Sequence, residues 1–266
     1  MNKKNPIAFI ILCFFIFSCS SVPLTGRRQL DIIPSDTMLS TSFQQYDEFL
    51  KSNKISTNQA QTNMVKSVGG RIQKAVEKYM ADNQMSSRLK NYNWEFNLIE
   101  NPEANAWCMP GGKVVVYTGI LPITKDENGL AVVMGHEIAH AIAKHGDERM
   151  SQGLIAEFGT AAISMALQSS PAATQKLWMN AFGVGTQYGI LLPYSRVHES
   201  EADHLGLIFM AMAGFDPNNA VGFWERMAAM KGSATVPEFL SSHPSDQNRI
   251  KNIKAQIPEA IGYYQK

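Results

Sequence analysis

Two histidines four positions apart, His136 and His140, have the spacing in this chain best suited to chemistry. An α-helix turns once every 3.6 residues, so positions i and i+4 share one face, where two neutral imidazoles can bind a single metal ion. Zinc is the usual ion for imidazole ligands. Glu137 lies one step round the helix, where its carboxylate can accept a proton from water on the metal. The spacing therefore predicts a zinc site with an adjacent general base.

The residues around these histidines predict a buried helix. Apolar stretches at 130–134 and 141–143 flank the pair, and Asp126 and Gly146 suit the start and the end of a helix. Two surface histidines can share this spacing by chance, but an apolar helix would bury them, and buried imidazoles need polar partners. HExxH on a helix is the motif of zinc peptidases, so the pattern favours metal-dependent proteolysis.

The N-terminus has the three zones of a secretory signal peptide. Lys3 and Lys4 precede an apolar run at 7–17, which Ser18 and Cys19 follow. The run is shorter than the roughly 18 to 20 residues that cross a bilayer. A small residue directly before a cysteine resembles the lipobox of bacterial lipoproteins, which would make Cys19 the lipidated first residue of the mature chain. Ordinary secretion is the alternative.

We therefore predict three parts: a signal peptide at 1–18, a lipidated tether at 19–34 and one zinc metallopeptidase domain at 35–266. The tether contains turn residues between Val22 and Leu30, which suits a spacer that lifts the domain off a membrane.

Composition limits the remaining function classes. Removal of the signal peptide leaves 22 of the 24 basic residues against 23 acidic ones, a balance that argues against nucleic acid as a partner. Cys13 is removed too, so Cys108 remains as a free thiol, predicted to be a half-buried strand residue, and the fold cannot rely on a disulfide. The apolar share of 45% is that of a globular protein.

Periodicity predicts a mostly helical domain with a few strands. The expected elements are helices at 35–50 and 58–80, a strand at 94–98, a hairpin of 106–109 and 113–117 around a turn at 110–112, and mainly helices after 119. The apolar stretch 153–192 carries too many polar residues for membrane helices. It predicts a buried helical hairpin, with a mobile flap over the metal cleft or a membrane-facing surface as alternatives.

A catalytic zinc normally takes three protein ligands and leaves one position for water. Candidates for the third ligand lie in the polar segment 196–204. Together with the HEIAH motif, ESEAD in this segment resembles the HExxH…ExxxD pattern of the gluzincin metallopeptidases, which include the HtpX proteases, the CAAX prenyl proteases and the BepA- and LoiP-type lipoprotein proteases.

Three more motifs carry this resemblance. Residues 105–112 are similar to that family's active-site edge strand, 242–250 to its C-terminal HPxxxR-type motif, and 22–30 to the start of its Oma-type and LoiP-type members. The motifs occur in the expected order over nearly the whole mature chain. The resemblance implies an α+β, predominantly helical, zincin-like fold with a small antiparallel sheet whose edge strand borders the active-site cleft.

The resemblance also assigns roles. It implies one Zn²⁺ per chain on His136, His140 and Glu199, with Glu137 as the catalytic base. Asp203, one helical turn after Glu199, would orient a ligand from outside the metal sphere.

The other polar residues near the motif are left with less defined roles. Glu201 is expected to be a solvated charge, and the family assigns no role to His198 or His204. In BepA-like members the histidine matching His243 can occupy the water position, so His243 is either an inhibitory fourth ligand or a loop residue that helps start the last helix. Arg249 would pair with Asp203 or Glu199, or be solvated.

The implied function is zinc-dependent endoproteolysis. An extended substrate would pair its backbone with the edge strand, through Asn105, Ala106, Trp107 and Cys108. Such binding suits misfolded or misassembled cell-envelope proteins, outer-membrane proteins above all. Membership implies a periplasmic, lipid-anchored location at the outer membrane of a Gram-negative bacterium, with outer-membrane assembly machinery as a partner.

The sequence leaves two other function classes to weigh against this one. One is a membrane-anchored chaperone or assembly factor for envelope proteins with a blocked or structural zinc site. BepA-like proteins combine both activities but carry a helical repeat domain that this sequence lacks, which favours the plain peptidase. The other, cleavage of prenylated or membrane-embedded substrates, requires several membrane helices, and the sequence shows none.

Overall fold

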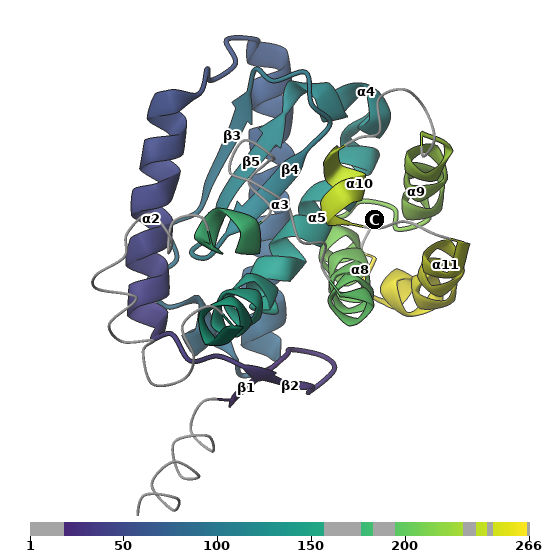
Figure 1. Cartoon of the computed structure of the whole chain (residues 1–266). Coiled ribbons are helices and arrows are strands. Elements are labelled where there is room, and N and C mark those ends of the chain that lie inside the picture. Colours follow the sequence, from purple (N-terminus) through teal and green to yellow (C-terminus); the bar gives the residue numbers. More distant parts are fainter. Residues whose placement is uncertain (1–18, 157–176, 183–194, 231–237, 244–246, 265–266) are drawn as a thin grey trace, which may run out of the picture.

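The computed structural model describes residues 19–156, 177–182, 195–230, 238–243 and 247–264 (Figure 1). Its strands are β1 (Cys19–Ser21), β2 (Arg28–Leu30), β3 (Glu95–Ile99), β4 (Ala106–Met109) and β5 (Lys113–Tyr117). Its α-helices are α2 (Ser35–Ser52), α3 (Gln59–Asp82), α4 (Leu121–Thr124), α5 (Glu127–Ile142), α8 (Arg196–Met212), α9 (Asn219–Ala229), α10 (Glu238–Ser242) and α11 (Gln247–Gly262). Short 3-10 helices cover Ser86–Leu89 and Thr118–Ile120. The predicted α+β, mainly helical architecture is confirmed.

Two predictions fall wholly or partly outside the described residues. The predicted signal peptide at 1–18 lies outside them, as does most of the apolar stretch 153–192. Of that stretch, 153–156 and 177–181 are helical. Within the described ranges, no helix combines the length and the apolar character needed to cross a membrane.

The three-stranded sheet has the order β3-β5-β4, so β4 lies at one edge as predicted. Strands β4 and β5 form the predicted antiparallel hairpin, and its turn places Gly111 and Gly112 at φ +84° and +80°, a region that favours glycine. Strand β3 pairs with β5 in parallel, so the prediction of an antiparallel sheet was wrong on this point. The hairpin turn makes β4 antiparallel to β5. Strand β3 pairs with the other edge of β5 and runs in the same direction as β5.

Helices cover both faces of this sheet. Side chains alternate along β4, so Trp107 packs toward α2, where its ring meets Phe49 edge-on at 4.9 Å, while Cys108 faces the core shared with α3 and α5. Burial leaves Cys108 only 5% exposed rather than half-buried. In Figure 1, α2 lies on one side of the sheet and α8 to α11 gather around the far side of α5. Helix α5 thus lies between the sheet and the C-terminal helices.

Helices α5 and α8 approach each other closely at two glycines. A Cβ added to Gly135 would lie 2.9 Å from the carbonyl oxygen of Gly206, and one added to Gly206 would lie 2.9 Å from the amide nitrogen of His136. Only residues without a side chain fit such a crossing. Because the backbones nearly touch here, acidic side chains one and two turns earlier on α8 reach the histidines of α5.

The N-terminal segment that was predicted as a tether is folded and packs against the domain. Strands β1 and β2 form an antiparallel hairpin, and Val22 and Gln29 are each only 2% exposed. The amide of Gln29 donates a 2.8 Å hydrogen bond to the carbonyl oxygen of Ala143, just after α5. Burial and hydrogen bonding therefore hold this segment against the domain. Lipidation of Cys19 and the proposed boundaries at residues 18 and 34 stay predictions.

Candidate metal centre

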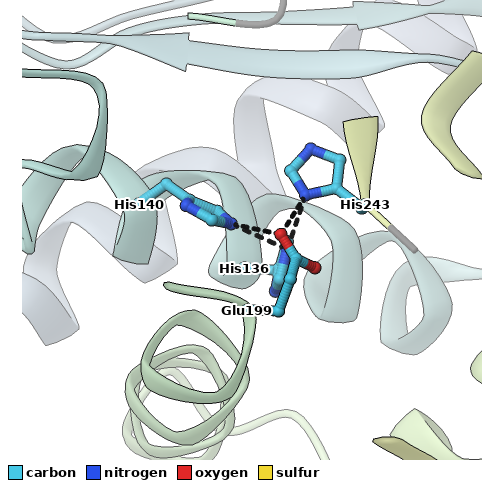
Figure 2. Close-up of side chains that lie close together, drawn as sticks. All are labelled: His136, His140, Glu199 and His243. Atoms are coloured by element: carbon cyan, nitrogen blue, oxygen red, sulfur yellow. Dashed lines mark hydrogen bonds and ion pairs between the residues drawn. The ribbon is translucent and has the colours of Figure 1, made fainter. Parts of the chain in front are cut away.

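Four buried side chains from three places in the chain converge on one point (Figure 2). His136 and His140 lie one turn apart on α5, Glu199 comes from α8, and His243 follows α10. One donor atom from each residue lies within 4.8 Å of all the others. Sequence reasoning named all four residues, and the structure brings them together.

The spacing of the donor atoms suits zinc. The Nε2 atoms of His136 and His140 are 3.1 Å apart, and Nδ1 of His243 lies 3.2 Å from Nε2 of His136 and 2.9 Å from Oε1 of Glu199. That carboxylate oxygen lies 3.4 Å from Nε2 of His140. In a tetrahedral site with bonds of about 2.0 to 2.1 Å, neighbouring donor atoms lie about 3.3 Å apart. The residues present therefore fit a zinc ion.

Hydrogen bonds set the protonation of the two helix histidines. Nδ1 of His136 lies 2.9 Å from Oδ1 of Asp203, and Nδ1 of His140 lies 2.9 Å from Nδ1 of His145. A proton on each Nδ1 leaves both Nε2 atoms as unprotonated acceptors that face each other across 3.1 Å. Burial lowers the pKa of both rings, which keeps them neutral. Two facing lone pairs repel each other unless a cation lies between them.

Glu137 lies beside this cluster without joining it. It is only 3% exposed, and its Oε1 lies 3.4 Å from Nε2 of His243. Burial raises the pKa of Glu137 to about 7, because the apolar surroundings disfavour its charged form. A carboxylate in this position can exchange a proton with a molecule at the metal.

Arg249 holds the two acidic residues of α8. Its Nε and Nη2 each donate a 2.8 Å hydrogen bond to Asp203, and its Nη1 lies 2.5 Å from Oε2 of Glu199. The guanidinium stacks 3.4 Å from the ring centroid of Trp224. Burial alone would raise the pKa of Glu199, but the charges of Arg249 and His243 outweigh it and hold that pKa well below its usual range. Glu199 is therefore a carboxylate ready to bind a cation.

Comparison with known proteins agrees with this geometry. The model of Peptidase family M48 matches residues 67–257, more than half of the chain. The chain belongs to peptidase family M48. The matched region includes α5, which carries His136, and α8, which carries Glu199.

Curated relatives are longer than this M48 chain. The mitochondrial metalloendopeptidase OMA1 of Schizosaccharomyces pombe is 41% identical over 175 residues, which are 65% of this chain and 50% of the relative. The human mitochondrial metalloendopeptidase OMA1 is 28% identical over 267 residues, 97% of this chain and 49% of the relative. The beta-barrel assembly-enhancing protease of Escherichia coli is 30% identical over 167 residues, which are 60% of this chain and 34% of the relative. The chain thus spans about half the length of these two OMA1 relatives.

The expectation that Glu201 is solvated was wrong. Glu201 is 5% exposed, and its carboxylate accepts hydrogen bonds from Thr25, Arg27 and His145. A helical wheel of α8 alone points this side chain away from Asp203, but the N-terminal hairpin covers that face of the helix.

The other histidines near the M48 motif lie outside the donor cluster. His198 is hydrogen-bonded to Glu148 at 3.0 Å, and His204 reaches Glu259 on α11 at 2.8 Å. His145 is the residue that sequence reasoning missed. It is five positions after His140, a spacing that a continuous helix would not place on the same face.

Proposed function

We propose that this M48 protein is a zinc-dependent endopeptidase. The observation that carries the proposal is the convergence of His136, His140 and Glu199 with Glu137 beside them. A zinc ion bound there would act as a Lewis acid, lowering the pKa of water and polarising a peptide carbonyl. Glu137 would accept the proton of the attacking water and return it to the leaving amine. Asp203 and Arg249 keep the ligand atoms of His136 and Glu199 in place while this happens.

We further propose that substrate peptides bind along β4. Both faces of this strand are packed, with Trp107 on one side and Cys108 on the other, so its main chain rather than its side chains would contact a peptide. Recognition through the backbone suits unfolded segments of many sequences.

Metal removal tests the proposed activity directly. The purified chain is expected to cleave an unfolded protein such as reduced casein, to lose this activity in the presence of a strong zinc chelator, and to regain it when zinc is added back. Stoichiometric zinc in the active sample is the accompanying measurement. Cleavage that persists after zinc has been removed would contradict the proposal, and a contaminating protease is excluded by the Glu137→Gln variant described below.

We propose that the substrates are misfolded or misassembled proteins of a bacterial cell envelope, with outer-membrane assembly machinery nearby. The similarity to the beta-barrel assembly-enhancing protease supports this, whereas the OMA1 relatives are mitochondrial by name, so the similarities alone favour no single location. The lipobox-like sequence before Cys19 favours a lipid anchor in the periplasm.

The anchor has a simple test. Cys19→Ser should move the full-length protein from the membrane fraction to the soluble fraction of the producing cells, because no thiol would remain at the predicted acylation site. Cys108→Ser is the matched control, since the Cys108 side chain is buried in the core, and it should leave the distribution unchanged. A Cys19→Ser protein that stays with membranes would contradict lipid anchoring at this residue.

A chaperone or assembly factor with a blocked zinc site is the second candidate function. The position of Nδ1 of His243 among the donor atoms favours it, because a fourth protein ligand occupies the place that a catalytic site leaves to water. A permanent block of the water position would indicate the chaperone function, whereas a reversible block would be compatible with the peptidase.

A further inference from the structure

A chain of hydrogen bonds leads from the metal centre to the N-terminal hairpin. Nδ1 of His140 lies 2.9 Å from Nδ1 of His145, and Nε2 of His145 lies 3.0 Å from Oε2 of Glu201. Arg27, in the loop before β2, contacts that same oxygen of Glu201 through its Nε at 3.0 Å. Arg27 also binds Glu148 through both of its terminal nitrogens, at 3.1 and 2.8 Å. These contacts connect four separate parts of the sequence.

When both rings are neutral, only one assignment of protons satisfies this chain. A carboxylate accepts hydrogen bonds and does not donate them, so Nε2 of His145 carries the proton that Glu201 accepts. Nδ1 of a neutral His145 is then an acceptor, and it takes the proton from Nδ1 of His140. His140 consequently offers an unprotonated Nε2 toward the metal position. His145 has no exposed surface, and its ring stacks on that of His198 at 4.5 Å.

The backbone explains how His145 reaches His140. Helix α5 ends at Ile142, and Lys144 adopts a φ of +58°, a left-handed conformation that is uncommon for a residue with a side chain. The chain turns there and becomes helical again at 145–156, which brings His145 back against the end of α5. This turn has to be held by contacts from elsewhere in the chain.

The N-terminal hairpin supplies these contacts. Arg27, Gln29 and Asp31 are spaced by two residues, so their side chains share one face of an extended chain. Arg27 binds Glu148, Gln29 binds the carbonyl oxygen of Ala143, and Asp31 binds the ammonium group of Lys144 at 2.8 Å. All three side chains thus hold the turn between α5 and the helix at 145–156.

We infer that His145 is a positioning residue that orients the metal ligand His140, and that the hairpin at 19–31, through Arg27 and Glu201, is an integral part of the metal centre. Ligand histidines generally donate their second ring N–H to an outer partner that fixes their orientation, commonly a carboxylate or carbonyl. In this chain the outer partner of His140 is a neutral histidine, His145, which itself donates a hydrogen bond to the carboxylate of Glu201. The inference deepens the proposed function and rests on its metal site.

Zinc affinity is the decisive measurement, because it involves no substrate. In the full chain, His145→Phe keeps an aromatic ring to stack on His198 but removes both nitrogens, and it should weaken zinc binding by about 10- to 100-fold in competition with a chromogenic chelator. His145→Gln keeps one acceptor and one donor and should recover part of this loss. The visible spectrum of the cobalt-substituted protein should change in His145→Phe, since the orientation of His140 would change.

A pair of arginine variants separates positioning from stability. Arg27→Met breaks the contact with Glu201, whereas Arg88→Met breaks a contact with the same hairpin, at the carbonyl oxygen of Ser21, without touching the chain to His140. Both should lower the melting temperature. Only Arg27→Met should also weaken zinc binding, by on the order of threefold to tenfold.

Different results would contradict the proposed zinc site and the positioning role of His145. A wild-type chain that binds no zinc would overturn both. Wild-type zinc affinity in folded His145→Phe would overturn the inference alone. If His145→Phe does not fold, equal zinc affinities of Arg27→Met and Arg88→Met would overturn it.

Discussion

Replacement of Glu137 by glutamine should abolish cleavage of unfolded protein while leaving zinc binding intact. Glu137 lies beside the donor cluster but is not among the residues whose donor atoms converge, so its loss removes no ligand. A glutamine of the same size cannot accept the proton of the attacking water. General acid–base catalysis contributes typically 10²- to 10⁴-fold, and we expect a loss of turnover in that range. Metal analysis and initial rates on the same preparation measure the two effects separately.

Glu127→Gln provides the control for this experiment. Glu127 lies in the first turn of the same helix, more than two turns before His136, and its side chain is 51% exposed. The same chemical change should leave both zinc content and turnover unaltered there. If Glu137→Gln cleaved as fast as the wild type, the proposed mechanism would be wrong.

Glu199→Ala and His243→Ala should have opposite consequences, although both remove one of the four converging side chains. Glu199 is the only carboxylate among the four converging residues, and its loss would leave the charge of Arg249 less neutralised beside the ion, so zinc affinity should fall by more than about 100-fold, the upper end of the loss for an outer partner. Glu199→Gln, which preserves side-chain size, should also bind zinc poorly. Chelator competition measures both.

His243→Ala should keep zinc, with an affinity within about tenfold of the wild type, because three protein ligands suffice for a catalytic zinc. With the fourth position open to water, the variant should cleave unfolded substrate faster than the wild type. Initial rates and melting temperatures, measured together, distinguish self-inhibition by His243 from a structural role of this residue. A variant that is both slower and less stable would rule out self-inhibition, and a zinc-loaded but inactive variant would favour the chaperone function.

The sequence by itself predicted the parts of this protein that depend on local geometry. Helical periodicity was sufficient for α2 and α3, because the positions of apolar residues report which face of a helix is buried, and α5 followed from its apolar stretches and the residues that start and end it. Pro110, Gly111 and Gly112 predicted the hairpin that makes β4 an edge strand, since two of them adopt the φ that such turns require. The four converging side chains were also named in advance, His136 and His140 from spacing and Glu199 and His243 from the resemblance of their motifs.

Only the tertiary structure decided which side chains surround those ligands. Glu201 looks solvated on α8 alone, and His145 is out of phase with His140 in a continuous helix. Both residues join the site because the left-handed Lys144 breaks the helix after α5 and the N-terminal hairpin packs against this region. The close crossing at Gly135 and Gly206 likewise has no signature beyond two glycines among many. Periodicity describes one element at a time, whereas these contacts join elements far apart in sequence, and their existence depends on how the elements pack.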